Sequence, residues 1–169
     1  ASEESGSEST ALNERNLADD EEEGARILRG ITLGRQIAFS PYLFSCHSGS
    51  KMPSYKDFVA SSPKLQYVMG CIKSVKNYFK DKGEPMSGQV IYSNAGISYF
   101  PLIKEYLIQE LGFKDSEIDF IKGGMSARKK ELVKEKFLDG RVKVLIGSQT
   151  IREGINLQNR ATDLYNLWL

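Results

Sequence analysis

The apolar residues of this chain follow a helical period in its first half and form short runs in its second half. Over residues 63–82 they recur every three or four positions, which is the period of one buried face on a helix. Ser62 before Pro63 suits the start of this helix, and Gly83 suits its end. Residues 25–39 carry the same period, so the first half of the chain is predicted to contain two long helical stretches.

From residue 89 onward, short apolar runs that suit strands alternate with stretches that suit helices. The predicted strands are residues 89–93, 118–121, 142–146 and 163–168. The predicted helices are residues 97–111 and 126–138, with a short helix or turn over 149–153. Because strands joined by single helices require right-handed crossovers, this order predicts a mostly parallel sheet with helices on both faces.

The beginning of the chain has a different composition. Residues 1–18 are rich in serine and glutamate and have almost no apolar residue to bury, which is typical of a linker or a disordered segment. An acidic run follows at residues 19–23, and negative charge favours the start of a helix. The sequence therefore predicts a flexible acidic linker over residues 1–25, a helical lead-in over 26–85 and an α/β domain over 86–169.

The net charge of +1 hides an asymmetry. Residues 1–25 contain nine acidic residues and one arginine, a net charge of −8, so residues 26–169 carry +9. A basic body suits a polyanionic partner such as nucleic acid, although a solvated lysine-rich surface explains the same charge. The two cysteines, Cys46 and Cys71, do not make a disulfide framework, which fits a reducing cytoplasm.

Neither a membrane segment nor a metal site is predicted. No apolar run is long enough to span a bilayer, and no segment typical of a secretory signal opens the chain. His47 adjoins Cys46, but one histidine and two separated cysteines do not make a zinc site, and no base is spaced for cysteine catalysis. Candidate chemistry lies instead in the loops of the predicted sheet.

Three loops leave the carboxyl ends of predicted strands, where parallel sheets bind their ligands. They comprise residues 93–96, 122–126 and 147–150, and all three carry small, hydrogen-bonding residues. Glycines let backbone N–H groups approach an anion, and Ser126 and Ser148 precede segments whose free helical N–H groups favour negative charge. Phosphate recognition is one interpretation. The other is that glycine and serine simply form turns and cap helices there.

The same region resembles the second lobe of superfamily-two helicases. Residues 144–157, with the sequence VLIGSQTIREGINL, look like motif V and fit best the Swi/Snf branch, in which the motif ends in Gly-Ile-Asn-Leu. Further segments resemble that branch in the same order and spacing: residues 33–36 (LGRQ) before 41–43 (PYL), 62–65 (SPKL), 89–93 (QVIYS) as motif IV, and 120–126 (FIKGGMS) as the next motif. The resemblance covers roughly residues 26–169.

This resemblance implies a RecA-like lobe of the P-loop NTPase type, with a mostly parallel sheet flanked by helices and a helical lead-in. Such a lobe closes on a first lobe around ATP while both lobes grip a nucleic-acid backbone. By position in the motifs, the residues expected to face phosphates are Ser93, Asn94, Gly123, Gly124, Ser148 and Gln149. Gly154 and Asn156 are expected near the ATP cleft, with Asn156 approaching the ribose.

Two residues of motif V depart from the family pattern. Ile151-Arg152 stand where the family has paired glycines, so DNA contact through that turn is expected to differ. Glu153 stands where many relatives have an apolar or basic residue. This divergence favours a bacterial or mobile-element protein of the cytoplasm, whereas a eukaryotic remodeller would act in the nucleus.

Several parts of a complete motor are not found in the sequence. It contains no Gly-x-x-x-x-Gly-Lys-Ser/Thr loop and no Asp-Glu pair after an apolar strand, and both would belong to the first lobe. The chain also ends before the arginine-rich helix that would follow. ATP and magnesium are therefore expected to be held mainly by the first lobe, no catalytic residue is assigned here, and the chain alone is expected to be inactive.

The predicted function is the C-terminal motor lobe of an ATP-dependent DNA translocase or helicase, acting on double-stranded DNA. Its partners would be that DNA and the first RecA-like lobe of the same polypeptide. Two alternatives remain. One is a non-catalytic α/β module that binds a phosphorylated ligand or partner protein, and the other is the equivalent lobe of an RNA helicase.

Overall fold

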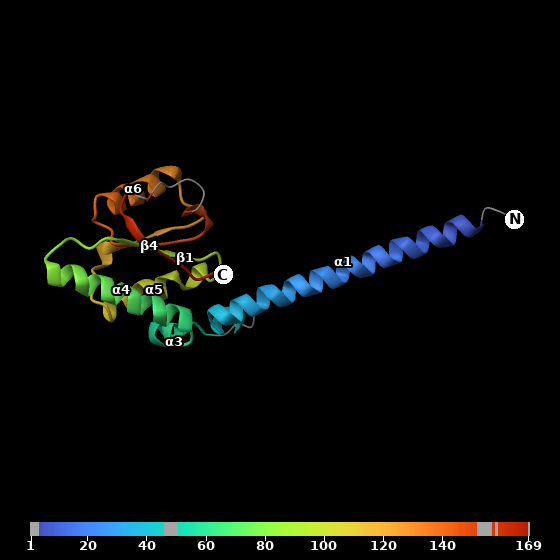
Figure 1. Cartoon of the computed structure of the whole chain (residues 1–169), viewed down its shortest axis with the longest axis horizontal. Helices are drawn as coiled ribbons and strands as arrows, with labels where there is room; N and C mark the ends of the chain where they lie inside the picture. Colours follow the sequence, from blue (N-terminus) through green and yellow to red (C-terminus); the bar gives the residue numbers. More distant parts are fainter. Residues whose placement is uncertain (1–3, 46–50, 152–156, 158, 169) are drawn as a thin grey trace. The chain divides into compact units, whose positions relative to one another are not determined.

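The computed structural model describes residues 4–45, 51–151, 157 and 159–168 (Figure 1). Contacts divide the chain into two compact units between Arg35 and Gln36, and the second unit holds the whole sheet together with residues 36–85. In the part of the chain that the structure describes, no helix combines the length and the hydrophobicity that a membrane crossing needs.

The described residues of the first unit, 4–35, all lie in one helix, α1 (Glu4–Phe39), whose last four residues belong to the second unit. The helix predicted over residues 25–39 is confirmed, but the helix begins far upstream, where the sequence predicted a linker or disorder over residues 1–18. The reason is that α1 contains no proline and many residues with high helix propensity, such as glutamate, alanine, leucine and arginine. The low hydrophobicity of residues 1–18 means that this segment is not expected to form a hydrophobic core, but it does not prevent the segment from forming a helix.

The second unit is built on four parallel strands, as predicted. The sheet has the order β2-β3-β1-β4, and every neighbouring pair is parallel. The central strands β1 and β3 are buried along their whole length, as expected where helices cover both faces. The strands are β1 (Gly88–Tyr92), β2 (Ile118–Ile121), β3 (Val144–Gly147) and β4 (Ala161–Asn166).

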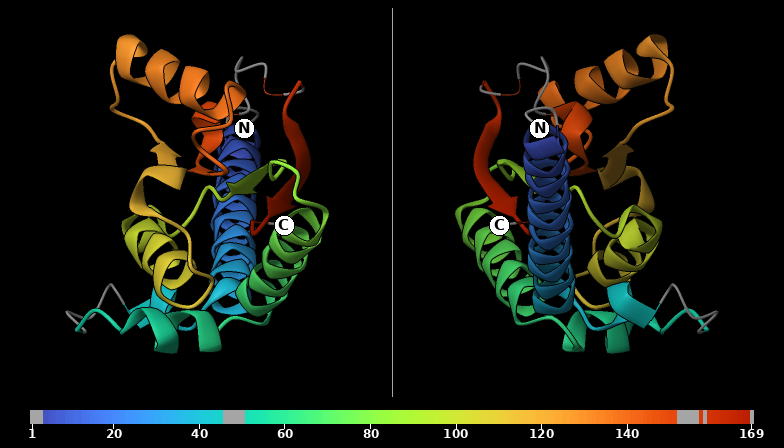
Figure 2. Two further views of the ribbon diagram at one scale, coloured as in Figure 1. Left: turned by 90° about the vertical axis from the view of Figure 1, so that its left-hand side faces the viewer. Right: turned by 90° about the vertical axis from the view of Figure 1, so that its right-hand side faces the viewer.

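Helices form one layer on each side of this sheet (Figure 2). One layer packs through the larger core cluster, which includes Leu65, Ile72 and Ile103, and the other packs through Val133 and Phe137. The first layer contains α3 (Tyr55–Ala60), α4 (Pro63–Lys82) and α5 (Phe100–Gln109), and the second contains α6 (Ala127–Leu138). Short elements join them: α2 (Tyr42–Ser45), η2 (Ile97–Tyr99), η3 (Asp115–Glu117) and η4 (Gln149–Ile151).

Local signals explain where most of these elements begin and end. The Ser62 side chain caps α4 by accepting a hydrogen bond from the Leu65 N–H at 3.2 Å, Pro63 occupies the first turn, and Gly83 ends the helix. The predicted helix over 97–111 is divided into η2 and α5, with Pro101 in the first turn of α5. The last two predicted strands are confirmed with boundaries shifted by one or two residues.

Two short helices, α2 and α3, lie in the helical lead-in, between the two long helical stretches that the sequence predicted. Ser54 caps α3 by accepting from the Asp57 N–H at 3.1 Å. The helix buries Phe58, whose ring stacks on that of Tyr99 with centroids 4.7 Å apart. A helix of six residues is too short to show a clear hydrophobic period in the sequence. Its stability comes from tertiary packing and its cap.

Candidate functional site

The carboxyl ends of all four strands meet at one edge of the sheet. Tyr92 of β1 is in register with Gly147 of β3 and with Asn166 of β4, and Gly147 is also in register with Ile121 of β2. The backbone continues this order one residue further, since the Ser93 N–H donates to the Gly147 carbonyl at 3.0 Å. The three predicted loops therefore leave the sheet side by side, as the parallel topology requires.

A glycine at this edge sets the spacing of the central loop. A Cβ atom at Gly147 would overlap the side chain of Ile151 and would lie 2.8 Å from the Ile121 carbonyl oxygen. Only glycine lets β3 pass so close to both neighbours, and η4 can then fold directly over the strand end. The Ser148 carbonyl accepts from the Ile151 N–H at 2.9 Å, which closes this turn.

The loop after β1 presents one polar side chain to solvent. The Ser93 side chain is buried. Its hydroxyl donates to the Ala95 carbonyl at 2.8 Å and accepts from the Ala95 N–H at 3.2 Å. Asn94 is exposed, and its Oδ1 accepts a hydrogen bond from the Tyr92 hydroxyl at 2.8 Å. The structure thus uses Ser93 to shape the loop and places Asn94 on its surface.

The loop after β2 is the most open of the three. Lys122, Gly123 and Gly124 are exposed, and Gly124 has a φ of +81°, a conformation that residues with a Cβ rarely adopt. Nothing lies within 4 Å of where a Cβ of either glycine would be. The Ser126 hydroxyl accepts from the Lys129 N–H at 3.3 Å and caps α6, so the helix-capping interpretation holds for this residue.

The remaining predicted site residues divide into two groups. Ser148 is buried at the end of β3, and Gln149 is exposed as the first residue of η4. Gly154 and Asn156, predicted near the ATP cleft, lie outside the described residues. Tyr92 was not predicted as part of the site, because its hydrogen bond to Asn94 depends on the path of the loop.

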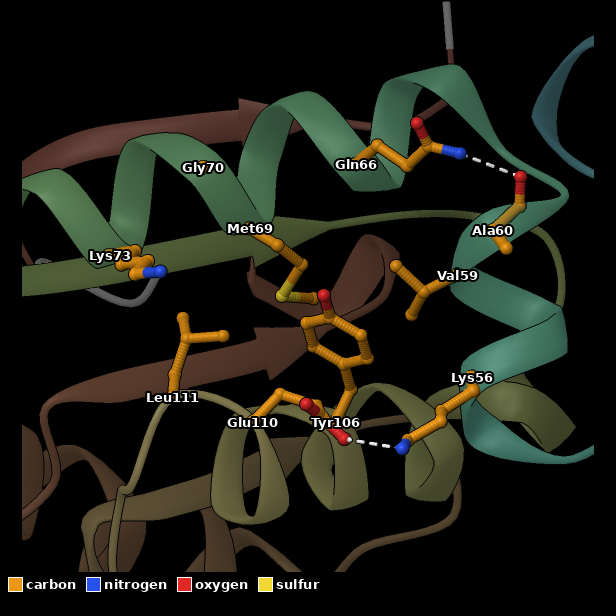
Figure 3. A pocket seen from close by; sticks show the side chains of 10 residues that line it. All are labelled: Lys56, Val59, Ala60, Gln66, Met69, Gly70, Lys73, Tyr106, Glu110 and Leu111. Atoms are coloured by element: carbon orange, nitrogen blue, oxygen red, sulfur yellow. Dashed lines mark hydrogen bonds and ion pairs between the residues drawn. The ribbon is translucent and has the colours of Figure 1, made fainter.

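Several hollows lie elsewhere on the second unit. One of about 610 Å³ lies among α3, α4 and α5, with Tyr106 and Met69 directed into it (Figure 3). Lys56 and Glu110 form an ion pair of 3.3 Å at its rim. Another lies between α4 and β4, where burial raises the pKa of Tyr165 and its hydroxyl donates to Gln89 at 2.7 Å. No residue of the three loops lines these hollows.

No candidate metal centre emerges from the described residues. Among them, no group of three or more histidine, cysteine, aspartate or glutamate side chains is placed to hold a metal ion. At the carboxyl edge the exposed hydrogen-bond donors are the amide of Asn94 and the backbone of Gly123 and Gly124. Such donors suit an anion that accepts hydrogen bonds.

Comparison with known families gives one match. Residues 74–162, more than half of the chain, match the family model described as the helicase conserved C-terminal domain. A comparison with curated proteins found no match.

Solved structures of SWI2/SNF2 ATPases share the fold. The Sulfolobus solfataricus SWI2/SNF2 ATPase C-terminal domain is similar with a TM-score of 0.58 and 21% identity, over 84% of this chain and 55% of that one. The core domain of the S. solfataricus ATPase gives a TM-score of 0.55 and 18% identity, over 83% and 31% of the two chains. The same core in complex with dsDNA gives 0.54 and 18%, over 83% and 32%.

The chain spans only part of the length of these solved structures. It spans about half of the length of the SWI2/SNF2 C-terminal domain and about a third of the ATPase core. The four-stranded parallel sheet and the helix layers on its two faces match the RecA-like arrangement expected from the motifs. The chain therefore belongs to the helicase conserved C-terminal domain family and has the RecA-like fold of the C-terminal lobe of SWI2/SNF2 ATPases.

Proposed function

We propose that this chain is the second motor lobe of an ATP-dependent translocase that moves along double-stranded DNA. The lobe supplies one wall of the ATP cleft and one half of the grip on the DNA backbone, and a first RecA-like lobe of the same polypeptide supplies the rest. The observation that carries this proposal is the pair of exposed donor sites at the carboxyl edge, Asn94 after β1 and Gly123–Gly124 after β2.

The chemistry of this edge suits a phosphate backbone. Exposed backbone N–H groups and neutral amides donate to phosphate oxygens without distinguishing bases, so they position the DNA and leave the lobe free to move along it. Lys122 adjoins the open glycine loop and adds a positive charge. The solved dsDNA complex of the S. solfataricus ATPase core, which has the same fold, supports duplex DNA as the ligand.

ATP would be shared between the two lobes. Gly154 and Asn156 of motif V would line the nucleotide side, and Asn156 would approach the ribose. Because the described residues offer no carboxylate cluster for a magnesium ion, the metal and the triphosphate would be held mainly by the first lobe. The residues of this lobe would then complete the cleft on closure, and closure would change the distance between the two grips on DNA.

The test is ATP turnover by the two-lobe polypeptide, meaning the polypeptide that carries this lobe together with the first. Turnover is measured without nucleic acid and with duplex DNA, single-stranded DNA or duplex RNA. We expect strong stimulation by duplex DNA, and we expect Gly154→Pro to abolish it while the fold is retained. Gly70→Ala is the matched control, because position 70 lies on the exposed surface of α4 with open space around it.

Each other outcome selects a different function. Greater stimulation by duplex RNA would identify an RNA motor. Absence of stimulation by any nucleic acid would exclude a motor. Weak DNA binding that does not change with salt would then favour the non-catalytic module for a phosphorylated ligand, because binding dominated by phosphate contacts falls steeply as salt rises.

A further inference from the structure

We infer that the Tyr92 hydroxyl orients the Asn94 side chain so that its NH₂ group faces a DNA phosphate. Tyr92 is then a positioning residue, which acts on DNA through Asn94. The inference rests on the proposed function, because it assigns a specific donor to the grip on the DNA backbone.

The position of Asn94 gives it a task that no other side chain of its loop can perform. Of the four residues at 93–96, Ala95 and Gly96 have no polar side chain, and the Ser93 hydroxyl is buried in hydrogen bonds to Ala95. Asn94 is exposed at the carboxyl edge, immediately after the last backbone hydrogen bond between β1 and β3. It is therefore the side chain through which this loop can reach a ligand.

Tyr92 holds one side of that amide. Its side chain is 8% exposed, and its partners in the sheet are Gly147 on β3 and Asn166 on β4. Strands on both sides fix the backbone of Tyr92, so its hydroxyl is a rigid support for the loop. This hydroxyl donates to Asn94 Oδ1 at 2.8 Å.

The direction of this hydrogen bond decides what Asn94 offers to a ligand. An asparagine side chain has one acceptor oxygen and an NH₂ group with two donors. Because Tyr92 occupies the oxygen, the NH₂ group is left for a partner outside. A phosphate oxygen only accepts hydrogen bonds, so this orientation attracts it, whereas an outward carbonyl oxygen would repel it. The tyrosine thus selects the orientation that fits DNA before the DNA arrives.

The experiment measures the Kd of the two-lobe polypeptide for a duplex DNA over a range of salt concentrations. Asn94→Ala and Tyr92→Phe should each weaken binding by about tenfold, the usual effect of losing a hydrogen bond to a charged group. The double variant should bind no more weakly than Asn94→Ala, because both changes remove the same contact. Asn94→Asp should bind more weakly than Asn94→Ala, because it retains an acceptor for Tyr92 and turns a carboxylate toward the phosphate.

The salt dependence separates this contact from an ionic one and from a change in folding. Since neither Asn94 nor Tyr92 is charged, their loss should leave the slope of log Kd against log salt unchanged. Lys122→Ala, at the neighbouring loop, should reduce that slope by about one. Tyr165→Phe is the matched control, because it removes a tyrosine hydroxyl that donates to Gln89 and not to the loop. It should bind DNA like the unaltered protein.

Three results would overturn the inference. In the first, Tyr92→Phe binds like the unaltered protein while Asn94→Ala does not. In the second, the two effects multiply in the double variant. In the third, Asn94→Ala binds normally although Lys122→Ala weakens binding, so that the loop after β1 does not touch the DNA. If the unaltered protein shows no salt-dependent binding to DNA at all, the proposed function itself fails.

Discussion

Glu117 is the residue at which charge and burial compete most clearly. It lies just before β2, where its Oε1 accepts from Lys143 Nζ at 2.6 Å and its Oε2 accepts from the Lys114 N–H at 2.9 Å. Burial alone would raise the pKa of Glu117, but the hydrogen bonds from Lys143 and from the Lys114 backbone outweigh it and hold this pKa below its usual value. The ion pair connects the amino ends of β2 and β3, opposite the candidate site.

Glu117→Gln should lower the free energy of unfolding by about 1 kcal/mol at pH 7, the upper range for a partly exposed ion pair. A depressed pKa stabilises the fold above the ordinary glutamate value of about 4.3. That stabilisation is lost as the pH falls through the lower value of the folded state. Urea unfolding at pH 7 and near pH 3 should therefore show a difference at pH 7 that disappears in acid. A gap that persists near pH 3 would contradict the assignment. Glu110→Gln, whose ion pair with Lys56 is more exposed, should show a smaller difference of the same sign.

Gly147→Ala tests the close packing at the carboxyl edge. The new methyl group would overlap Ile151 and approach the Ile121 carbonyl, so the substitution should cost about 1–3 kcal/mol of stability and displace η4. Gly70 lies in the middle of α4 with open space around its Cβ position, so Gly70→Ala should instead stabilise the helix by about 1 kcal/mol. Thermal unfolding of the two variants checks both signs. An unchanged midpoint for Gly147→Ala would mean that the strand end can shift without cost.

At the scale of elements, α4 depends on a buried cap. Ser62 is inaccessible to solvent, and its hydroxyl accepts from the Leu65 N–H at the start of a 20-residue helix. Ser62→Ala should cost about 1 kcal/mol in urea unfolding, since it leaves that buried N–H without a partner. Ser74→Ala, on the exposed surface of the same helix, should change stability by less than about 0.5 kcal/mol. Equal effects at both positions would show that the cap contributes nothing specific.

The same elements show what a sequence can reveal about this fold. The helix α4 and the strands β1 and β2 were predicted almost to the residue. Their signals, an apolar period with caps for the helix and short apolar runs for the strands, lie within the segments themselves. The short helix α3 and the early start of α1 were missed. The first depends on packing of Phe58 against Tyr99, and the second depends on helix propensity without a buried face. Neither signal is visible as a hydrophobic period.

The candidate site follows the same division. Its three loops were predictable because parallel strands bring their carboxyl ends to one edge. The sequence could not predict that Ser93 is buried while Asn94 is exposed. That difference depends on the path of the loop, which brings the Ser93 hydroxyl to the Ala95 carbonyl and the Tyr92 hydroxyl to Asn94 Oδ1. For Gly154 and Asn156 the motif remains the only guide.

At the scale of the whole molecule, we expect this lobe to supply a platform with hydrogen-bond donors and to leave most groups of phosphoryl transfer to another lobe. Transfer of a phosphoryl group requires charge stabilisation by a phosphate cradle, a metal ion and cationic side chains. The sequence has no phosphate-binding loop, and the described residues hold no cluster for a metal. We therefore expect this lobe to contribute to an ATP site only together with another lobe.

The 169-residue chain alone should therefore release no phosphate from ATP above background, with or without duplex DNA. The two-lobe polypeptide, assayed at the same concentration, should hydrolyse ATP and respond to duplex DNA. Circular dichroism of the chain should show a folded α/β protein, so that inactivity is not mistaken for unfolding. Turnover by the folded chain alone would mean that its own residues build a phosphate cradle and recruit the metal. The division of labour between two lobes would then be wrong, and the carboxyl edge would have to serve ATP as well as DNA.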